Sequence, residues 1–339
     1  MSAGDSRQAG PLLDVRELRA EFRTRAGVVR AVDGVSFSVQ PGQVLAVLGE
    51  SGCGKTATAL AILGLLPSPA GRVVGGQVLF KGEDLLTARP GRIRQIRGNR
   101  IAMVFQEPVL NPVSRVGDQV SEVIRAHRNV PSKEATERAV ALLDLVGIPQ
   151  ARDRSRDYPH QFSGGMRQRA MIAMAIALDP ELLIADEPTT ALDVTVQAQV
   201  LELLLGVRER LGMAMILITH DLGVVAGVAE RVMVMYAGRN VEEADLADLY
   251  RDPRHPYTAG LLASTIRLDR PRRGAMAQIA GTPPNLIEEP AGCRFAPRCP
   301  HADQRCREDY PVPVAVGVGH HSACHYAARW AEGDVWPRS

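Results

Sequence analysis

The octet GESGCGKT, residues 49–56, constrains the fold of this chain more than any other stretch. It lies between a short apolar run, VLAVLGE (44–50), and an apolar stretch, TATALAILGLL (56–66). The first run predicts a buried parallel strand, and the second predicts a helix. Glycine, four residues and Gly-Lys-Thr between a strand and a helix form the pattern of a phosphate-binding loop. We therefore expect an α/β fold with a phosphate site at this turn.

The chemistry of this loop follows from its residue types. The glycines let the backbone curl so that its N–H groups face phosphate oxygens, and the helix start adds the positive end of its dipole. Lys55 is expected to reach the β- and γ-phosphates of a nucleotide, and the Thr56 hydroxyl to bind magnesium. Cys53 is expected to present its backbone, not its thiol, to the phosphate. The residues expected to contact the nucleotide here are Gly49, Glu50, Ser51, Gly52, Cys53, Gly54, Lys55, Thr56 and Ala57.

A second nucleotide element is ELLIADEP, residues 181–188. Its apolar residues 182–185 predict a buried strand with Asp186 and Glu187 at the carboxyl end, where ligands gather in open α/β sheets. Asp186 is suited to hold magnesium. Glu187 is suited to polarise an attacking water, because phosphoryl transfer needs an aligned nucleophile.

Length, charge and the first residues bound the class of protein. A chain of 339 residues with 45% hydrophobic residues predicts two domains, or one domain with insertions. Lys and Arg number 40 against 38 for Asp and Glu, so nucleic acid is not an expected partner. The opening MSAGDSRQAG lacks the pattern of a secretory signal, and no stretch reaches the roughly 18 apolar residues of a spanning helix. These features predict a cytosolic protein.

Four cysteines cluster near the end of the chain, at Cys293, Cys299, Cys306 and Cys324. Their spacing leaves open a disulfide staple, a zinc site or an iron–sulfur cluster. A reducing cytosol favours metal ligands over disulfides. The gaps of five, six and seventeen residues match neither common zinc fingers nor ferredoxin runs, and soft thiolates suit either metal. Zinc stays open because of the nearby histidines, His301, His320, His321 and His325.

The stretch FSGGMRQRAMIAMAIAL, residues 162–178, supplies another set of backbone donors where a Ser-Gly-Gly turn opens a helix. One nucleotide does not need two such cradles on the same face. With the elements above, the chain resembles the ATP-binding subunits of ABC transporters. In that family the signature turn of one subunit closes over the γ-phosphate held by the other, and Ser163, Gly164 and Gly165 match this turn.

The resemblance covers roughly residues 12–250 and implies roles for further residues. Gln106 in MVFQEP corresponds to the Q-loop, where it joins Thr56 and Asp186 at magnesium and takes part in catalysis with Glu187. Asp193 in TALD corresponds to the D-loop, and His220 in ILITHD to the catalytic switch histidine. Phe22 is expected to stack on adenine, the alternative being a packed core phenylalanine.

The stretches EPVLNPVSRVGDQV (107–120), HPYTAGLL (255–262) and GTPPNL (281–286) resemble the oligopeptide/dipeptide importer branch, as does the four-cysteine tail. That branch carries a [4Fe-4S] cluster at a matching tail, so the resemblance implies a cluster on the four cysteines, with zinc as the alternative. Its expected role is structural. The tail is rich in proline and glycine with little apolar surface of its own, so metal binding would supply its folding free energy.

The resemblance also implies the organisation of the chain. Residues 1–254 are expected to form an ABC-type nucleotide-binding domain, with a RecA-like core, an antiparallel β subdomain and a helical subdomain inserted at about 107–165. Residues 12–48 are expected to form short alternating strands, and residues 133–148 a helix. Residues 255–339 are expected to form a small Cys-rich C-terminal extension.

The implied partners follow from a single phosphate loop, since one chain can hold one nucleotide but cannot complete the site around it. We expect a dimer with a paralogous or identical ATPase subunit, two transmembrane permease subunits, and an extracytoplasmic solute-binding protein reached through the permease. The chain would then lie peripherally at the cytoplasmic face of the membrane and power peptide import by hydrolysing ATP. The alternatives are import of nickel or another small solute, and a soluble ABC ATPase acting on nucleic acid or the ribosome.

Overall fold

The computed structural model describes residues 10–190, 192–264, 279–288 and 290–330. The chain divides into two compact units, and each is described by itself. The described part of the first unit comprises residues 10–12, 39–43, 83–190 and 192–217. The second comprises residues 13–38, 44–82 and the described residues from 218 onward.

The first unit contains the strand that was expected to carry two carboxylates. Strand β7 (Leu182–Asp186) is buried throughout and pairs in parallel with β6 (Ile101–Val104), with Ile101 opposite Leu182. Strand β8 (Ala214–Thr219) lies on the other side of β7. Continuous apolar runs of this kind are typical of parallel strands covered on both faces. The short β5 (Glu83–Asp84) and the helices α2 (Pro90–Ile96) and α7 (Val194–Leu211) complete the unit outside its helical cluster.

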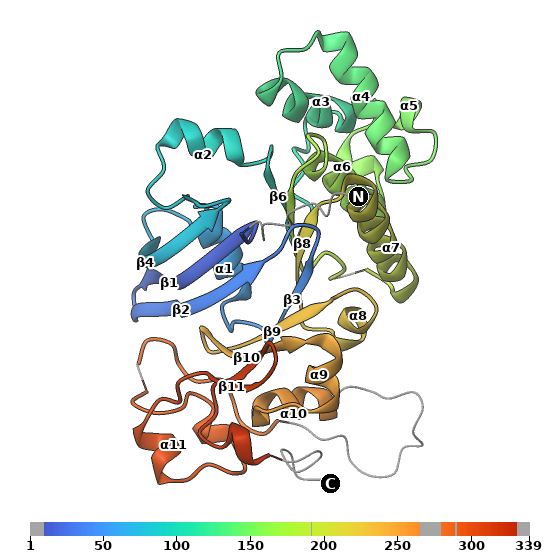
Figure 1. Ribbon diagram of the computed structural model, residues 1–339. Coiled ribbons are helices and arrows are strands. Elements are labelled where there is room, and N and C mark those ends of the chain that lie inside the picture. Colours follow the sequence, from blue (N-terminus) through green and yellow to red (C-terminus); the bar gives the residue numbers. More distant parts are fainter. Residues whose placement is uncertain (1–9, 191, 265–278, 289, 331–339) are drawn as a thin grey trace, which may run out of the picture. The chain divides into compact units, whose positions relative to one another are not determined.

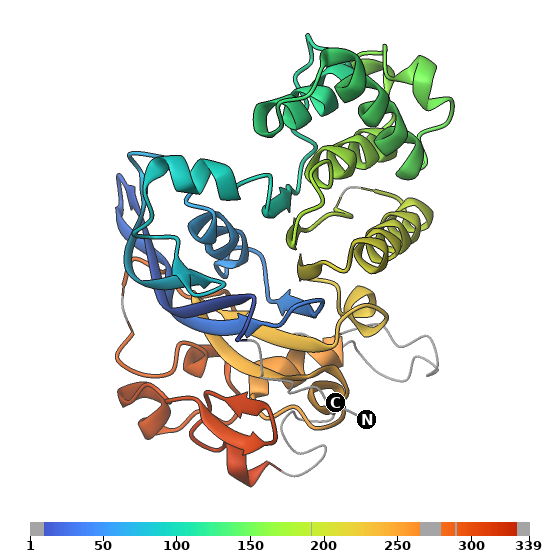
Figure 2. The same ribbon diagram turned by 45° about the horizontal axis from the view of Figure 1, so that its top comes forward.

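The helical cluster of the first unit consists of α3 (Val116–His127), α4 (Ser132–Leu145), α5 (Ala151–Arg154), the 3-10 turn η1 (Pro159–Gln161) and α6 (Gly164–Ala175). Figure 2 shows α3, α4 and α6 gathered together. In α3 and α4 the fully buried residues recur at four-residue spacing, which places them on one face of each helix. The helix expected over 133–148 ends at Leu145, because Gly147 turns the chain with a φ of 75°.

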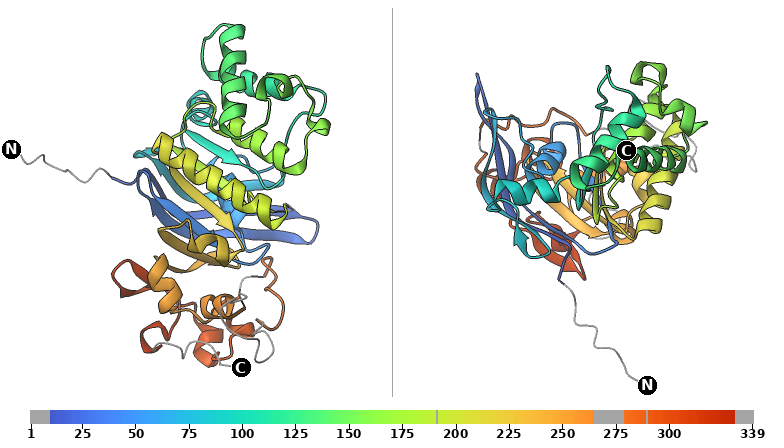
Figure 3. Two further views of the ribbon diagram at one scale, coloured as in Figure 1. Left: turned by 90° about the vertical axis from the view of Figure 1, so that its right-hand side faces the viewer. Right: turned by 90° about the horizontal axis from the view of Figure 1, so that it is seen from above.

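The second unit begins with an antiparallel sheet in the order β2-β1-β4. Its strands are β1 (Leu13–Thr24), β2 (Gly27–Val39) and β4 (Gly71–Phe80), and Figure 3 shows the long strands at the blue end of the colour scale. The expectation of short strands over 12–48 is therefore wrong. A bulge between Arg16 and Arg19, where Glu17 adopts a φ of 45°, shifts the register and lets β1 continue instead of ending.

A second sheet region in this unit has the order β3-β9-β10-β12-β11. Strand β3 (Val44–Leu48) is fully buried and runs parallel to β9 (Arg231–Tyr236), as expected for the strand before the phosphate loop. Strand β10 (Arg239–Asp245) pairs antiparallel with β9 and with β12 (His320–Ser322), and β11 (Val314–Gly317) pairs with β12 (Figure 1). The end of the chain therefore adds strands to the sheet that contains β3.

The helices of the second unit are α1 (Lys55–Ile62), α8 (Leu222–Ala226), α9 (Leu246–Arg251), α10 (Pro256–Ser264) and α11 (Gln304–Glu308), with the 3-10 turns η2 (Ala296–Arg298) and η3 (Ala327–Arg329). Residues from the extension enter the core, since Tyr257 and Phe295 are 0% and 1% exposed. Their rings lie 5.4 Å apart, and both pack against Tyr236 of β9. The expectation that this tail has little apolar surface to fold with was wrong for this aromatic cluster.

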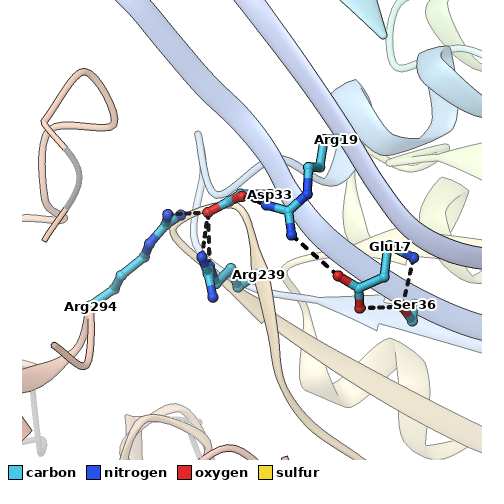
Figure 4. Close-up of polar contacts among 6 residues, drawn as sticks. All are labelled: Glu17, Arg19, Asp33, Ser36, Arg239 and Arg294. Atoms are coloured by element: carbon cyan, nitrogen blue, oxygen red, sulfur yellow. Dashed lines mark hydrogen bonds and ion pairs between the residues drawn. The ribbon is translucent and has the colours of Figure 1, made fainter. Parts of the chain in front are cut away.

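A buried carboxylate also joins the extension to the second unit. Asp33 of β2 accepts hydrogen bonds from Arg19, from Arg239 at 2.7 and 2.9 Å, and from Arg294 of the extension (Figure 4). The side chains of Asp33 and Arg294 are each 5% exposed. Burial by itself raises the pKa of Asp33, but the hydrogen bond from Arg239 and the charges of the three arginines outweigh it and lower that pKa.

The described residues contain no helix with the length and apolar character needed to cross a membrane.

Asp33→Asn should destabilise the chain at neutral pH, by about 3 kcal/mol or more, because it leaves buried arginine charge unpaired. Since the folded state lowers the pKa of Asp33, the stability that it contributes is complete above its unfolded pKa of about 3.9 and falls as the pH drops below that value. The variant should lose that part of the acid dependence. Urea unfolding at several pH values measures both effects. Asp248→Asn, which removes an exposed pair with Arg251, is the control and should change stability by less than about 1 kcal/mol. Equal stability of the two variants would contradict this account.

Candidate functional site

The phosphate-binding octet lies in the second unit, between β3 and α1. Three of its residues, Gly49, Gly52 and Gly54, have φ values of 154°, 80° and 106°. A Cβ atom on Gly49 would lie 2.3 Å from the Met235 carbonyl oxygen, and one on Gly54 would lie 2.2 Å from the Ala31 carbonyl oxygen. Glycine is therefore required at these two positions both by conformation and by space. The turn opens α1 as the sequence predicted.

Lys55 is buried at the start of α1. Its ammonium group donates hydrogen bonds to the carbonyl oxygens of Gly49 at 2.7 Å and Glu50 at 3.1 Å. The charge of this side chain is thereby directed into the curl of the loop. Thr56 is exposed and Ala57 is half-buried.

Cys53 is buried within the loop, and burial raises the pKa of its thiol. Its carbonyl oxygen accepts a hydrogen bond of 2.8 Å from the Gly238 N–H, so the loop is attached to the turn between β9 and β10. The Cys53 side chain therefore packs inside the loop, and its carbonyl oxygen anchors the loop to Gly238.

The structure brings His220 and the loop together. His220 follows β8 and lines a pocket of about 450 Å³ with Gly49, Glu50 and Ser51. Leu261, Ser264 and Ile279 of the extension line the same pocket. The next residue, Asp221, caps α8 by accepting a hydrogen bond of 2.7 Å from the Gly223 N–H, which fixes the chain after His220.

Phe22 is half-buried in β1, opposite Gly71 of β4. A Cβ atom on Gly71 would lie 3.0 Å from its ring, so the ring packs against the strand where a side chain is absent.

The candidate residues for hydrolysis and for the signature turn lie in the first unit. Gln106 donates a hydrogen bond of 3.2 Å to Oε2 of Glu187, and the Thr190 hydroxyl donates one of 2.9 Å to the same oxygen. Glu187 has a φ of 44° and is 9% exposed, and Asp186 is 1% exposed. A non-glycine residue with positive φ at the end of a strand is uncommon and turns the carboxylate away from the strand direction.

The signature turn begins α6. Ser163 caps this helix by accepting a hydrogen bond of 3.3 Å from the Met166 N–H, and Asp193 caps α7 in the same way from Val196 at 2.9 Å. A Cβ atom on Gly165 would lie 2.9 Å from the Val196 side chain. The two turns are therefore neighbours, and Gly164 and Gly165 let the backbone of one approach the start of the other.

The four clustered cysteines line one pocket in the second unit, together with His255, His301, His325 and Trp330. The N–H of Cys293 donates a hydrogen bond of 2.8 Å to the Cys306 carbonyl oxygen. Burial raises the pKa of the Cys293 thiol to about 11 and that of Cys299 to about 12, so both thiols are protonated at neutral pH. Within the described ranges, no three His, Cys, Asp or Glu side chains form a group that could hold a metal ion. The other two candidate histidines are not among the residues that line this pocket. The His320 ring hydrogen-bonds Glu242 at 2.8 Å, and His321 is exposed on β12.

Sequence reasoning missed three residues at these sites. Thr190 lies three residues after Glu187, and a Ser or Thr at that distance from a catalytic carboxylate was an available signal. Tyr257 and Arg298 contact Glu50, through a hydrogen bond of 2.8 Å to the Tyr257 hydroxyl and an ion pair of 2.6 Å to Arg298. They lie 207 and 248 residues away in the sequence, where no local pattern indicates a contact.

Comparison with known proteins identifies the family. A family model described as "ABC transporter" matches residues 32–190, and one described as "Oligopeptide/dipeptide transporter, C-terminal region" matches residues 241–306. A probable peptide ABC transporter ATP-binding protein of Sinorhizobium fredii is 51% identical over 97% of this chain and 97% of its own. A dipeptide transport ATP-binding protein of Bacillus subtilis is 48% identical over 96% of this chain and 97% of its own.

Among solved structures, a dimeric ATP-binding cassette in a post-hydrolysis state, bound to ADP and Pi, is 25% identical. It superposes with a TM-score of 0.62 and covers 69% of this chain and 98% of its own. The expected α/β fold of the nucleotide-binding domain is thereby confirmed. On this sequence identity and coverage, the chain belongs to the ATP-binding proteins of ABC transporters, in their oligopeptide/dipeptide branch.

Proposed function

We propose that this chain is the ATP-hydrolysing subunit of an ABC importer that powers uptake of peptides through a membrane permease. The observation that carries the proposal is the loop of residues 49–56, whose positive-φ glycines surround the buried Lys55 ammonium next to the pocket of His220. The names of the relatives favour peptides over nickel or another small solute, and transport over a soluble ATPase acting on nucleic acid or the ribosome.

The second unit binds the triphosphate. The loop amides and the dipole of α1 attract phosphate oxygens, and Lys55 exchanges its two carbonyl partners for oxygens of the β- and γ-phosphates. Thr56 contributes its hydroxyl to magnesium, and Phe22 stacks on the adenine. His220, in the pocket beside Gly49 and Glu50, serves the γ-phosphate end.

The first unit supplies the groups for hydrolysis. Asp186 and Gln106 are assigned to magnesium, and Glu187 aligns and polarises the attacking water. Glu187 suits this role because Gln106 and Thr190 both hydrogen-bond one of its oxygens, Oε2.

The signature turn of Ser163, Gly164 and Gly165, with Asp193 beside it, serves a nucleotide bound to a partner subunit that is a paralogue or a second copy. The helical subdomain after Gln106 docks cytoplasmic loops of the permease, whose two transmembrane subunits receive the solute from an extracytoplasmic binding protein. The chain then works peripherally at the cytoplasmic face of the membrane.

Glu187→Gln should still bind ATP and magnesium but hydrolyse ATP at least about 100-fold more slowly, because the water loses its orienting base while the phosphate contacts remain. Lys55→Ala should lose binding at nucleotide concentrations that saturate the unaltered chain. Equilibrium binding of a fluorescent ATP analogue and phosphate release by the assembled transporter measure the two steps separately. Normal phosphate release by the Glu187 variant would reject its role as the base.

The composite site predicts that the chain alone is a poor ATPase. Phosphate release should be low for a sample shown to be monomeric by light scattering, and should rise on assembly with the partner ATPase and the permease. Co-purification of the chain with a membrane permease tests the transport assignment directly. A monomer that turned over ATP as fast as the whole transporter would exclude the composite site.

A structural [4Fe-4S] cluster at the C-terminal pocket is the second part of the proposal. It is supported by the four cysteines that line one pocket. Four cysteine thiolates would ligate a cubane cluster, which would cross-link the tail. Because cysteine binds a metal as the thiolate, loading the site must release protons, so assembly should slow as the pH falls. Zinc on the same thiols is the alternative occupant.

Anaerobically purified protein should be brown and contain roughly four irons per chain. Cys→Ser at any one of the four positions should bleach the colour and make the tail sensitive to protease. Cys53→Ser is the matched control, because this buried cysteine lies in the phosphate loop, and it should leave the colour intact. Colourless anaerobic protein with one zinc per chain would reject the cluster in favour of zinc.

A further inference from the structure

We infer that Arg298 and Tyr257 of the C-terminal extension position the phosphate loop, so that the extension forms part of the nucleotide site. The inference rests on the proposed function, since it concerns the loop that we assign to ATP. Both residues act on Glu50, the second residue of the loop, and both lie with it in the second unit.

Arg298 holds the Glu50 side chain. Its Nη1 donates to Oε2 of Glu50 at 2.6 Å, and its Nη2 donates to Oε1 at 3.0 Å, which is the bidentate geometry that arginine forms with carboxylates. The Arg298 side chain is 4% exposed, whereas that of Glu50 is 28% exposed. Such a buried fork loses little entropy on pairing and fixes direction as well as distance.

The extension in turn fixes Arg298. Its guanidinium donates to the carbonyl oxygens of Ala280 at 2.9 Å and Ile279 at 3.2 Å, and to the Tyr236 hydroxyl at 3.3 Å. These bonds orient the fork toward Glu50. Arg298 is the last residue of the turn η2, which begins at Ala296. The residue before this turn is Phe295, whose ring packs edge-on against Tyr236 at 5.2 Å.

Tyr257 holds the Glu50 backbone. Its hydroxyl accepts a hydrogen bond of 2.8 Å from the Glu50 N–H, and its ring is fully buried against Tyr236 at 4.6 Å. The hydroxyl cannot move without disturbing this aromatic cluster. Glu50 is therefore fixed at both its side chain and its N–H by residues of the extension.

Glu50 also contacts the cation of the site. Its carbonyl oxygen and that of Gly49 both accept hydrogen bonds from the Lys55 ammonium, at 3.1 and 2.7 Å. A displacement of Glu50 therefore moves Lys55 and changes the width of the phosphate cradle. An ion pair that served only stability would not need to meet the loop at this residue.

The experiment measures ATP affinity and thermal stability of the nucleotide-free full chain for the same variants. Arg298→Gln and Tyr257→Phe should each weaken binding of a fluorescent ATP analogue by about fivefold or more. Arg298→Lys keeps the charge but loses the fork, so it should recover part of the affinity. The matched control is Arg307→Gln, which removes an exposed arginine of the same extension and should leave affinity unchanged.

A double variant separates positioning from general damage. Combined with Glu50→Gln, Arg298→Gln should weaken ATP binding less than the product of the two single effects, because both remove one interaction. Variants that lower the melting temperature but bind ATP with unchanged affinity would overturn the inference. A fully multiplicative loss in the double variant would also overturn it. If the unaltered chain is folded, as judged by melting at the same temperature as Arg307→Gln, and yet fails to bind ATP, that result would reject the proposed function. It would reject this inference as well, because the inference rests on that function.

Discussion

The path of the phosphate loop depends on how closely its backbone approaches two other strands. Gly54 lies so near the Ala31 carbonyl of β2, and Gly49 so near the Met235 carbonyl of β9, that a Cβ atom on either would come within 2.3 Å of an oxygen. No side chain can occupy that space without moving a strand. The loop is consequently packed between β2 and the end of β9, and the shape offered to phosphate is set by those strands as much as by the loop sequence.

The turn from β9 to β10 joins this arrangement to the C-terminal extension. Gly238 donates its N–H to the Cys53 carbonyl and accepts a hydrogen bond from the Asp33 N–H, both at 2.8 Å. Arg239 pairs with the Asp33 carboxylate, and Arg294 reaches both that carboxylate and the Ala237 carbonyl oxygen. Three consecutive residues therefore connect the phosphate loop, β2 and the segment that carries the cysteines. A structural change in that segment can therefore reach the loop through a few contacts, namely the pairs of Asp33 with Arg294 and Arg239 and the hydrogen bond from Gly238 to Cys53.

The hydrolytic group of the first unit is organised more simply. Glu187 lies at the end of a buried parallel strand, and its positive φ and its bonds from Gln106 and Thr190 orient the carboxylate before any nucleotide is bound. Preorganisation of this kind lowers the reorganisation needed when the water is deprotonated. Ser163 caps α6 and Asp193 caps α7, and each cap fixes the turn that opens its helix.

Local patterns were sufficient for the elements that carry the motifs. A continuous apolar run predicted β3 and β7, four-residue apolar spacing predicted α4, and the turn residues predicted the starts of α1 and α6, because each signal acts within a few residues along the chain. The same local patterns did not predict structure that depends on contacts with residues far along the chain. The bulge at Glu17 that lengthens β1 forms against β4, and the aromatic core under the extension forms only when Tyr236, Tyr257 and Phe295 meet. From the sequence, Glu50 was expected to contact the nucleotide, and no role was predicted for its partner Arg298. Their contact spans 248 residues of sequence, and it exists because folding, not spacing, brings the buried Arg298 guanidinium within reach of that carboxylate.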